Sequence, residues 1–257
     1  MAKRLVSDDF CSFDAPDVLD YMSKKVTDKQ SPFAWSHFHE IVTDMLVHFG
    51  SHEVLEIGGG RSPFLSRQIV EKNDLHYTVN DISSSELARA PDWVSTSCFD
   101  IAGTEISDHN QYDFIFSKMV IEHVTDARQA YRNIFNLLKP DGVYFNFHPL
   151  LYSPPFIVNY LLPETLSRKI LRFFFPRRND EGIPKFPAFY SYCVVSDRTE
   201  KMLREIGFSH SLMMPFWGHN YFDRMPVIRQ VDERVHRWAQ NHDVKQLASF
   251  CYSVGQR

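Results

Sequence analysis

The stretch best suited to chemistry runs Val54-Leu55-Glu56-Ile57-Gly58-Gly59-Gly60-Arg61-Ser62-Pro63. An apolar run ends in the acidic Glu56, and three glycines follow. Because glycine has no Cβ, a ligand can lie directly against such a backbone, and the first N–H groups of a following helix lack intrahelical partners. Ser62 is a favourable N-cap, and Pro63 suits the first helical position. The stretch therefore predicts a buried strand, a ligand-binding glycine turn and a helix over about 63–73.

Two classes of ligand fit this glycine turn. A dinucleotide is bound by G-x-G-x-x-G, in which the third glycine allows close packing of helix and strand. In this chain Pro63 stands at the third position, and Glu56 favours a cationic ligand over a pyrophosphate. These two residues argue against an NAD-linked dehydrogenase. A glycine turn that binds no ligand is the structural alternative.

The same stretch resembles motif I of the class I S-adenosylmethionine (SAM) dependent methyltransferases, in particular the small-molecule enzymes of the type 11 group. In that family the strand ends in an acid and a glycine loop. The resemblance implies SAM as the methyl donor, S-adenosylhomocysteine as the product and no metal. It assigns the methionine part of SAM to four residues: Glu56, Gly58, Gly59 and Gly60.

A second acidic residue, Asp81, ends the next expected strand, 76–80. In Rossmann-type sheets an acid at this place can accept hydrogen bonds from two ribose hydroxyls. We therefore expect Asp81, with Ile82 beside it, to hold the ribose of the cofactor. The alternative is that Asp81 caps a helix that begins at 83.

The expected strand 94–99 ends at another acid, Asp100. The family resemblance implies that Phe99, Asp100 and Ile101 line the slot for the adenine ring. Since aspartate also favours turns, a purely structural role is the alternative for Asp100.

The expected strand 112–117 runs on into Lys118 and Met119. In parallel sheets of this kind, ligands bind at the carboxyl ends of the strands where the strand order reverses. We therefore expect Ser117, Lys118 and Met119 beside the methyl donor, largely through backbone contacts.

Two histidines are candidate general bases. Glu122-His123-Val124 resembles the E-H-V box of the small-molecule enzymes, and a neutral His123 imidazole near the methyl group would accept a proton from a hydroxyl acceptor. The alternative is that His123 only holds its loop. His148, at the end of the expected strand 143–147, is the second candidate.

Strands and helices are expected to alternate, which predicts an α/β fold with a parallel sheet. The resemblance implies a Rossmann-like, doubly wound sheet of seven strands, whose last strand runs antiparallel between the fifth and sixth, with helical insertions that form a substrate cap. Lys139-Pro140-Asp141-Gly142 is expected as a turn, and Asp197 as the cap of a helix over 198–206. We expect one domain, 1–257, in four parts: a helical cap (1–50), a SAM-binding core (51–149), a substrate-cap insertion (150–195) and the C-terminal part of the sheet with an inserted helix (196–257).

The segment 150–195 and the C-terminal part are expected to shape the acceptor site. We expect four side chains to touch the substrate: Tyr152, Tyr190, Tyr192 and His219. Ile228, Val231, Val235 and Trp238 mark the apolar face of a helix over 226–241, which is expected to form a second wall of the acceptor pocket. The aromatic and basic segment 156–178 is expected to cap the site, and the alternative is peripheral contact with a membrane surface or a lipid-linked acceptor.

Composition limits the function classes. The net charge of −4 argues against nucleic acid as a partner. Four scattered cysteines, without C-x-x-C, argue against a zinc site and favour reduced thiols. With no apolar leader and no run of ~20 apolar residues, we expect a cytoplasmic protein.

These observations predict a SAM-dependent methyltransferase that acts on a hydroxyl, or an amine, of a small molecule such as a sugar, a glycan, a phenol or another secondary metabolite. Two alternatives are a methyltransferase for a lipid-linked acceptor and a non-catalytic SAM-binding scaffold of the same fold.

Overall fold

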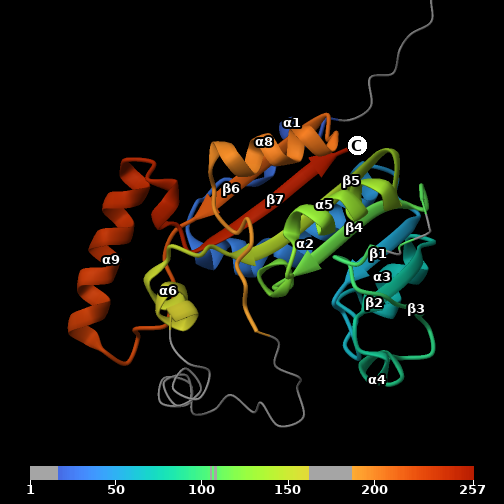
Figure 1. Ribbon diagram of the computed structural model, residues 1–257, viewed down its shortest axis with the longest axis horizontal. Helices are drawn as coiled ribbons and strands as arrows, with labels where there is room; N and C mark the ends of the chain where they lie inside the picture. Colours follow the sequence, from blue (N-terminus) through green and yellow to red (C-terminus); the bar gives the residue numbers. More distant parts are fainter. Residues whose placement is uncertain (1–16, 105, 107–108, 162–186) are drawn as a thin grey trace, which may run out of the picture.

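The computed structural model describes residues 17–104, 106, 109–161 and 187–257 (Figure 1). Seven strands form one sheet in the order β3-β2-β1-β4-β5-β7-β6, and β7 runs antiparallel to both of its neighbours. The strands are β1 (Glu53–Ile57), β2 (His76–Asp81), β3 (Ser95–Cys98), β4 (Tyr112–Lys118), β5 (Leu138–Pro149), β6 (His210–Phe216) and β7 (Phe250–Gln256). The predicted α/β, Rossmann-like fold with an antiparallel last strand is confirmed.

Helices cover both faces of this sheet. In Figure 1, α5 and α8 lie in front of the strands, and α2 passes behind them. The α-helices are α1 (Val18–Lys25), α2 (Ser31–His48), α3 (Arg67–Lys72), α4 (Ser84–Leu87), α5 (Ala127–Leu137), α6 (Pro154–Leu161), α8 (Asp197–Ile206) and α9 (Pro226–Asn241). Two short 3₁₀ helices are η1 (Ile121–His123) and η2 (Lys245–Leu247). Within the described part of the chain, no helix combines the length and the apolar character needed to cross a membrane.

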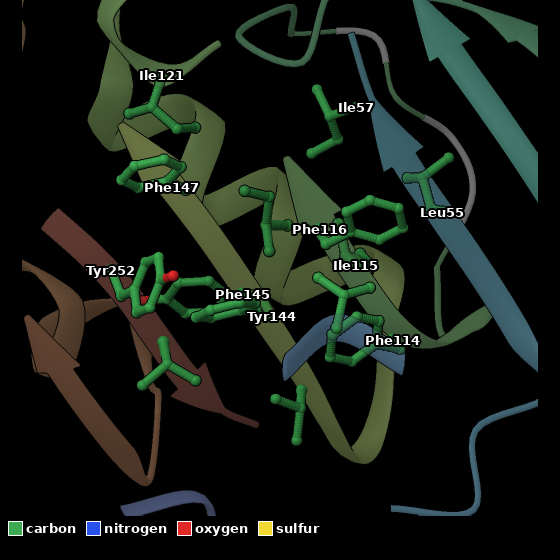
Figure 2. Close-up of a cluster of buried hydrophobic side chains, with 14 of the residues drawn as sticks. Leu55, Ile57, Phe114, Ile115, Phe116, Ile121, Tyr144, Phe145, Phe147 and Tyr252 are labelled. Atoms are coloured by element: carbon green, nitrogen blue, oxygen red, sulfur yellow. The ribbon is translucent and has the colours of Figure 1, made fainter. Parts of the chain in front are cut away.

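An aromatic core holds the central strands against α2. Phe116, Phe145, Phe147 and Tyr252 lie in this core (Figure 2). The Phe38 ring of α2 packs on Phe145 and Phe147, with centroid distances of 5.2 and 5.5 Å. Because strands at the centre of a doubly wound sheet are buried on both faces, they appear in the sequence as nearly continuous apolar runs. The core thereby fixes the strand ends at which the candidate site lies.

Two predicted helix starts are wrong. The helix after β1 begins at Arg67 with Ser66 as its N-cap, not at Ser62 and Pro63. The loop persists because the Phe64 N–H donates to the Glu56 carboxylate, a tertiary contact that holds the chain out of a helix. At α8, Ser196 rather than Asp197 caps the helix by accepting from the Thr199 N–H.

Two further expectations need correction. The turn expected at 139–142 is counted within β5, which changes register opposite Tyr112 and Phe114 and has Asp141 at φ 64°. Helix α9 has the predicted bounds, but its apolar face points outward and Trp238 is 53% exposed. Its buried face carries Asp232, His236 and Ala239 instead. Periodicity therefore located the helix but not the side that packs.

Candidate cofactor and acceptor site

The glycine loop at the end of β1 exposes its own backbone. The N–H groups of Gly58 and Gly59 both donate to the carbonyl of Asn80, at 2.8 and 3.1 Å, which holds the loop against β2. Gly58 has φ +75° and Gly60 has φ +50°, which L side chains rarely adopt. A Cβ on Gly58 would lie 2.6 Å from a methyl carbon of Val120. The loop can therefore keep this shape only with glycine, because neighbouring side chains occupy the space that a Cβ would need.

The Glu56 side chain packs under the glycine loop and makes hydrogen bonds that hold it. Its side chain is buried and accepts hydrogen bonds from the Phe64 N–H, at 2.9 Å, and from the Tyr77 hydroxyl. A Cβ on Gly59 would lie 2.6 Å from the Glu56 carboxyl carbon. Burial raises the pKa of Glu56 to about 7, although both hydrogen bonds oppose the shift. In the structure Glu56 therefore holds the loop in place through its hydrogen bonds. Direct contact between Glu56 and a cofactor remains a prediction.

Asp81 faces the loop from the end of β2. One carboxylate oxygen accepts from the Ser83 N–H at 2.8 Å, and the other lies 3.0 Å from the place that a Cβ of Gly60 would occupy. The cap of α4 is Ser83, so the alternative role of Asp81 as that cap is wrong. Ile82, beside it, is largely exposed. One oxygen of Asp81 is therefore directed toward the loop, as a ribose contact would require.

An ion pair that the sequence did not predict links the glycine loop to α4. Arg61 donates to both carboxylate oxygens of Glu86 in a bidentate pair, and both side chains are partly buried. Glu86 also lies against Gly60, since the Cβ of Glu86 is 3.3 Å from the place that a Cβ on Gly60 would occupy. Because the two residues are 25 positions apart, only the approach of β1 and β2 brings them together.

The residues expected at the adenine ring differ in accessibility. Asp100 is exposed, and one of its oxygens accepts from the Ala102 N–H at 2.9 Å, as a turn residue does. Phe99 is partly buried, but Ile101 is packed in the core. The Ile101 side chain is thus not open to a ligand in this structure, because it packs inward, and Phe99 and Asp100 remain the accessible pair.

The end of β4 combines a buried polar contact with an unusual lysine. Ser117 is buried and donates to the Asn146 side-chain oxygen at 2.8 Å. Met119 has φ 58° and turns the chain. The Lys118 ammonium lies 5.2 to 5.4 Å from three ring centroids, those of Trp35, Phe38 and Phe64. Burial lowers the pKa of Lys118. Phe64 belongs to the glycine loop, so Lys118 lies where that loop meets α2.

The two candidate bases differ in access. His123 is about one-third exposed, and its Nδ1 lies 3.1 Å from the carbonyl of Pro187. Since a carbonyl can only accept, Nδ1 carries the proton and the neutral ring keeps its lone pair on Nε2. His148 is 1% exposed, and burial lowers its pKa to about 4. His148 is therefore neutral at pH 7, but its side chain is buried and cannot contact an acceptor substrate.

Glu122, which the sequence analysis did not select, is fully buried beside His123. Its Oε1 lies 3.7 Å from His123 Nε2, and its Oε2 has no hydrogen-bond partner. Burial raises the pKa of Glu122 to about 8, so the carboxyl group carries a proton at pH 7. Its carbonyl accepts from the N–H groups of Phe189 and Tyr190, which ties the E-H-V box to the segment after 187.

A cavity of about 1180 Å³ opens between the start of α2, the turn after β6 and α9. Of the four predicted substrate residues, His219 lines this cavity. Tyr190 is buried against Phe156, and Tyr152 is exposed elsewhere. Tyr192 packs under Arg198. Five cavity residues come from α9, as expected of a second wall: Asp232, Glu233, His236, Arg237 and Gln240. Most of the segment 156–178 lies outside the described residues.

Comparisons with known proteins bear on this arrangement. The family described as "Methyltransferase domain" matches residues 55–144, which run from β1 into β5. No curated protein sequence matches the chain.

Several solved structures share the fold. Phosphoethanolamine N-methyltransferase 2 of Haemonchus contortus is 15% identical with a TM-score of 0.50, and the match covers 80% of this chain but 48% of that one. The chain thus spans about half the length of that enzyme. The [4+2]-cyclase SpnF is 15% identical with a TM-score of 0.50, covering 86% and 80% of the two chains. The CurJ carbon methyltransferase is 17% identical with a TM-score of 0.50, covering 85% and 53%. Residues 55–144 therefore match a methyltransferase domain, and the chain has the fold of the class I SAM-dependent methyltransferases.

Proposed function

We propose that this chain is a SAM-dependent methyltransferase that acts on a hydroxyl group of a small molecule. The observation that carries the proposal is the glycine loop with Asp81 beside it. The positive φ angles of Gly58 and Gly60 hold the loop in a tight turn at the end of β1, and such a turn suits a ligand bound along its backbone. A carboxylate oxygen directed toward that loop suits the ribose of the same ligand. The family match over residues 55–144 supports this reading of the loop.

The relatives support SAM as the cofactor and leave the acceptor open. The Haemonchus enzyme is described in complex with phosphomonomethylethanolamine and S-adenosylhomocysteine. The other two neighbours are a carbon methyltransferase and a cyclase, so one fold accommodates different acceptors and reactions. The choice of a hydroxyl acceptor therefore rests on this chain's own residues.

When bound, SAM supplies a methyl group that its sulfonium charge already activates. The chain then has to align the acceptor oxygen, exclude water and remove one proton. We assign proton removal to His123, because its contact with the Pro187 carbonyl leaves the lone pair on Nε2. The buried, protonated Glu122 beside it adds no negative charge at pH 7.

The cavity beside α9 is our candidate for the acceptor. Its wall combines aromatic rings from Trp35, Tyr221 and Phe250 with the side-chain amides of Gln30 and Gln240. Such a mixture of flat apolar faces and hydrogen-bonding groups suits a hydroxylated ring, as in a sugar or a phenol. Trp35 also lies under the Lys118 ammonium at the end of β4, so this wall extends toward the proposed cofactor site.

Methyl transfer from labelled SAM to a panel of sugars and phenols tests the proposal. His123→Asn should lower turnover by about 100-fold or more, while SAM affinity stays within about twofold. His210→Asn, an exposed histidine in β6, is the matched control and should leave turnover unchanged. Equal turnover in wild type and His123→Asn would remove the base assignment. SAM binding without transfer to any acceptor would favour the non-catalytic scaffold.

A further inference from the structure

Three potential metal ligands converge in the wall of the cavity. Asp232 and His236 lie one turn apart on the buried face of α9, and His219 reaches them from the turn after β6. His219 Nε2 is 3.4 Å from one oxygen of Asp232, and His236 Nε2 is 3.4 Å from the other. All three ligand atoms lie within 4.8 Å of one another.

These side chains are buried without adequate partners. Side-chain exposure is 0% for His219, 9% for Asp232 and 6% for His236. Each Nε2 contacts only the Asp232 carboxylate, at 3.4 Å and outside hydrogen-bond geometry, and Nδ1 of His236 has no hydrogen-bond partner. Because a buried polar atom without a hydrogen bond costs about 1–3 kcal/mol, three such atoms on two neighbouring imidazoles call for an explanation.

We propose that His219, Asp232 and His236 bind a divalent first-row transition-metal ion of the Zn²⁺ class. Two donors at ~2.0–2.1 Å from a tetrahedral ion lie about 3.3–3.4 Å apart. Each imidazole Nε2 lies 3.4 Å from an oxygen of Asp232, and the two nitrogens contact different oxygens of that carboxylate. Two imidazoles and one carboxylate are a common three-ligand set for such ions. All three residues line the cavity, so an oxygen of a cavity ligand can complete the coordination. The site stands independently of the proposed methyltransferase activity.

Binding requires one local adjustment. The Tyr221 N–H donates to His219 Nδ1 at 3.3 Å, which places the ring proton on Nε2. A metal takes the lone pair of Nε2, so the proton has to move to Nδ1 and the Tyr221 N–H has to turn away. This contact is at the long, weak end of the hydrogen-bond range, and the turn also contains Gly218 at φ +91°. The adjustment is therefore confined to one short turn.

Titration of the chelator-treated protein with Co²⁺, followed by visible absorption, tests the site. We expect one equivalent of Co²⁺ with the strong absorption of a four-coordinate ion, displaced by Zn²⁺. Asp232→Asn should weaken binding by more than about 100-fold, since loss of an outer-shell partner alone costs about 10–100-fold. His242→Gln, an exposed histidine just after the same helix, is the matched control and should bind normally. Circular dichroism and thermal unfolding establish that both variants are folded.

Three results would overturn the proposal. Wild type that binds no Co²⁺ would make the three residues a structural tie between the turn and α9. Binding that survives Asp232→Asn would put the ion elsewhere, and so would binding that His242→Gln abolishes. None of these results bears on SAM affinity, so the metal site and the proposed function fail separately.

Discussion

Two glutamate side chains are buried, one at the glycine loop and one beside His123, and burial raises the pKa of both. Glu56 supports the loop through Phe64 and Tyr77, and Glu122 lies beside His123. The sequence identified Glu56 from its place before three glycines. Glu122 belongs to the E-H-V box, but its neighbours in the sequence do not indicate that its side chain is buried, and its carbonyl is bound by the distant N–H groups of Phe189 and Tyr190. The sequence thus shows which carboxyl groups the chain contains, whereas their burial in the fold determines their pKa values.

Stability should depend on pH through Glu56. Its pKa is 4.5 when exposed and about 7 in the fold, so the folded state holds the proton more tightly. The contribution of Glu56 protonation to the free energy of unfolding is fully present below pH 4.5. It is lost as pH rises through 7, which lowers the free energy of unfolding by about 3 kcal/mol. Relative to Glu56→Gln, the free energy of unfolding of wild type should therefore fall between pH 4.5 and 8.

Chemical denaturation at a series of pH values measures this difference. Glu71→Gln, which removes an exposed carboxylate of α3, is the control and should follow wild type. Parallel pH curves for wild type and Glu56→Gln would contradict the raised pKa of the buried Glu56.

Asp81 should matter for cofactor affinity more than for folding. Asp81→Asn keeps an oxygen for the Ser83 N–H but loses the charge directed toward the loop. Loss of one charge-assisted hydrogen bond costs about 1.5–3 kcal/mol, so SAM affinity should fall about 10- to 100-fold. Calorimetric titration measures the change, with the exposed Asp92→Asn as control. Unchanged affinity in folded Asp81→Asn would remove Asp81 from the site.

At the scale of elements, local signals located strands and helices but not all of their contacts. The alternation of strands and helices predicted the parallel part of the sheet, whereas the turn expected at 139–142 lies within β5. The start of α3 was mispredicted because Ser62 and Ser66 are equally good caps, and the Glu56 contact with Phe64 selects the later one. The outward apolar face of α9 was mispredicted because the partners of Asp232 lie on a distant turn and on α9 itself.

The shape of the glycine loop makes Gly58 intolerant of a side chain. Gly58→Ala adds a Cβ at φ +75° and brings it 2.6 Å from Val120, so we expect a loss of about 1–3 kcal/mol in unfolding free energy. In a Val120→Ala background the steric part should disappear and the backbone part should remain. Urea denaturation of the two single variants and the double variant separates these parts. A Gly58→Ala protein as stable as wild type would contradict the loop geometry.

At the scale of the whole molecule, the order of the motifs was sufficient to predict the sheet. The first three strands are each followed or ended by an acidic residue, Glu56, Asp81 or Asp100. The antiparallel direction of β7 was predicted from the family resemblance. The acceptor side was less predictable, because its cavity is built from the start of α2, the turn after β6 and α9, which are far apart in the chain. Of the four residues expected at the substrate, only His219 lines that cavity.

Calorimetric titration of the purified protein with SAM, S-adenosylhomocysteine and NAD tests the central claim most directly. The glycine loop, Pro63 and Asp81 predict binding of both SAM and S-adenosylhomocysteine, with Kd values of about 1–100 µM, or about 5.5–8 kcal/mol, and no response to NAD. Tight binding of NAD without binding of SAM, or binding of none of the three, would contradict the assignment of this site to SAM.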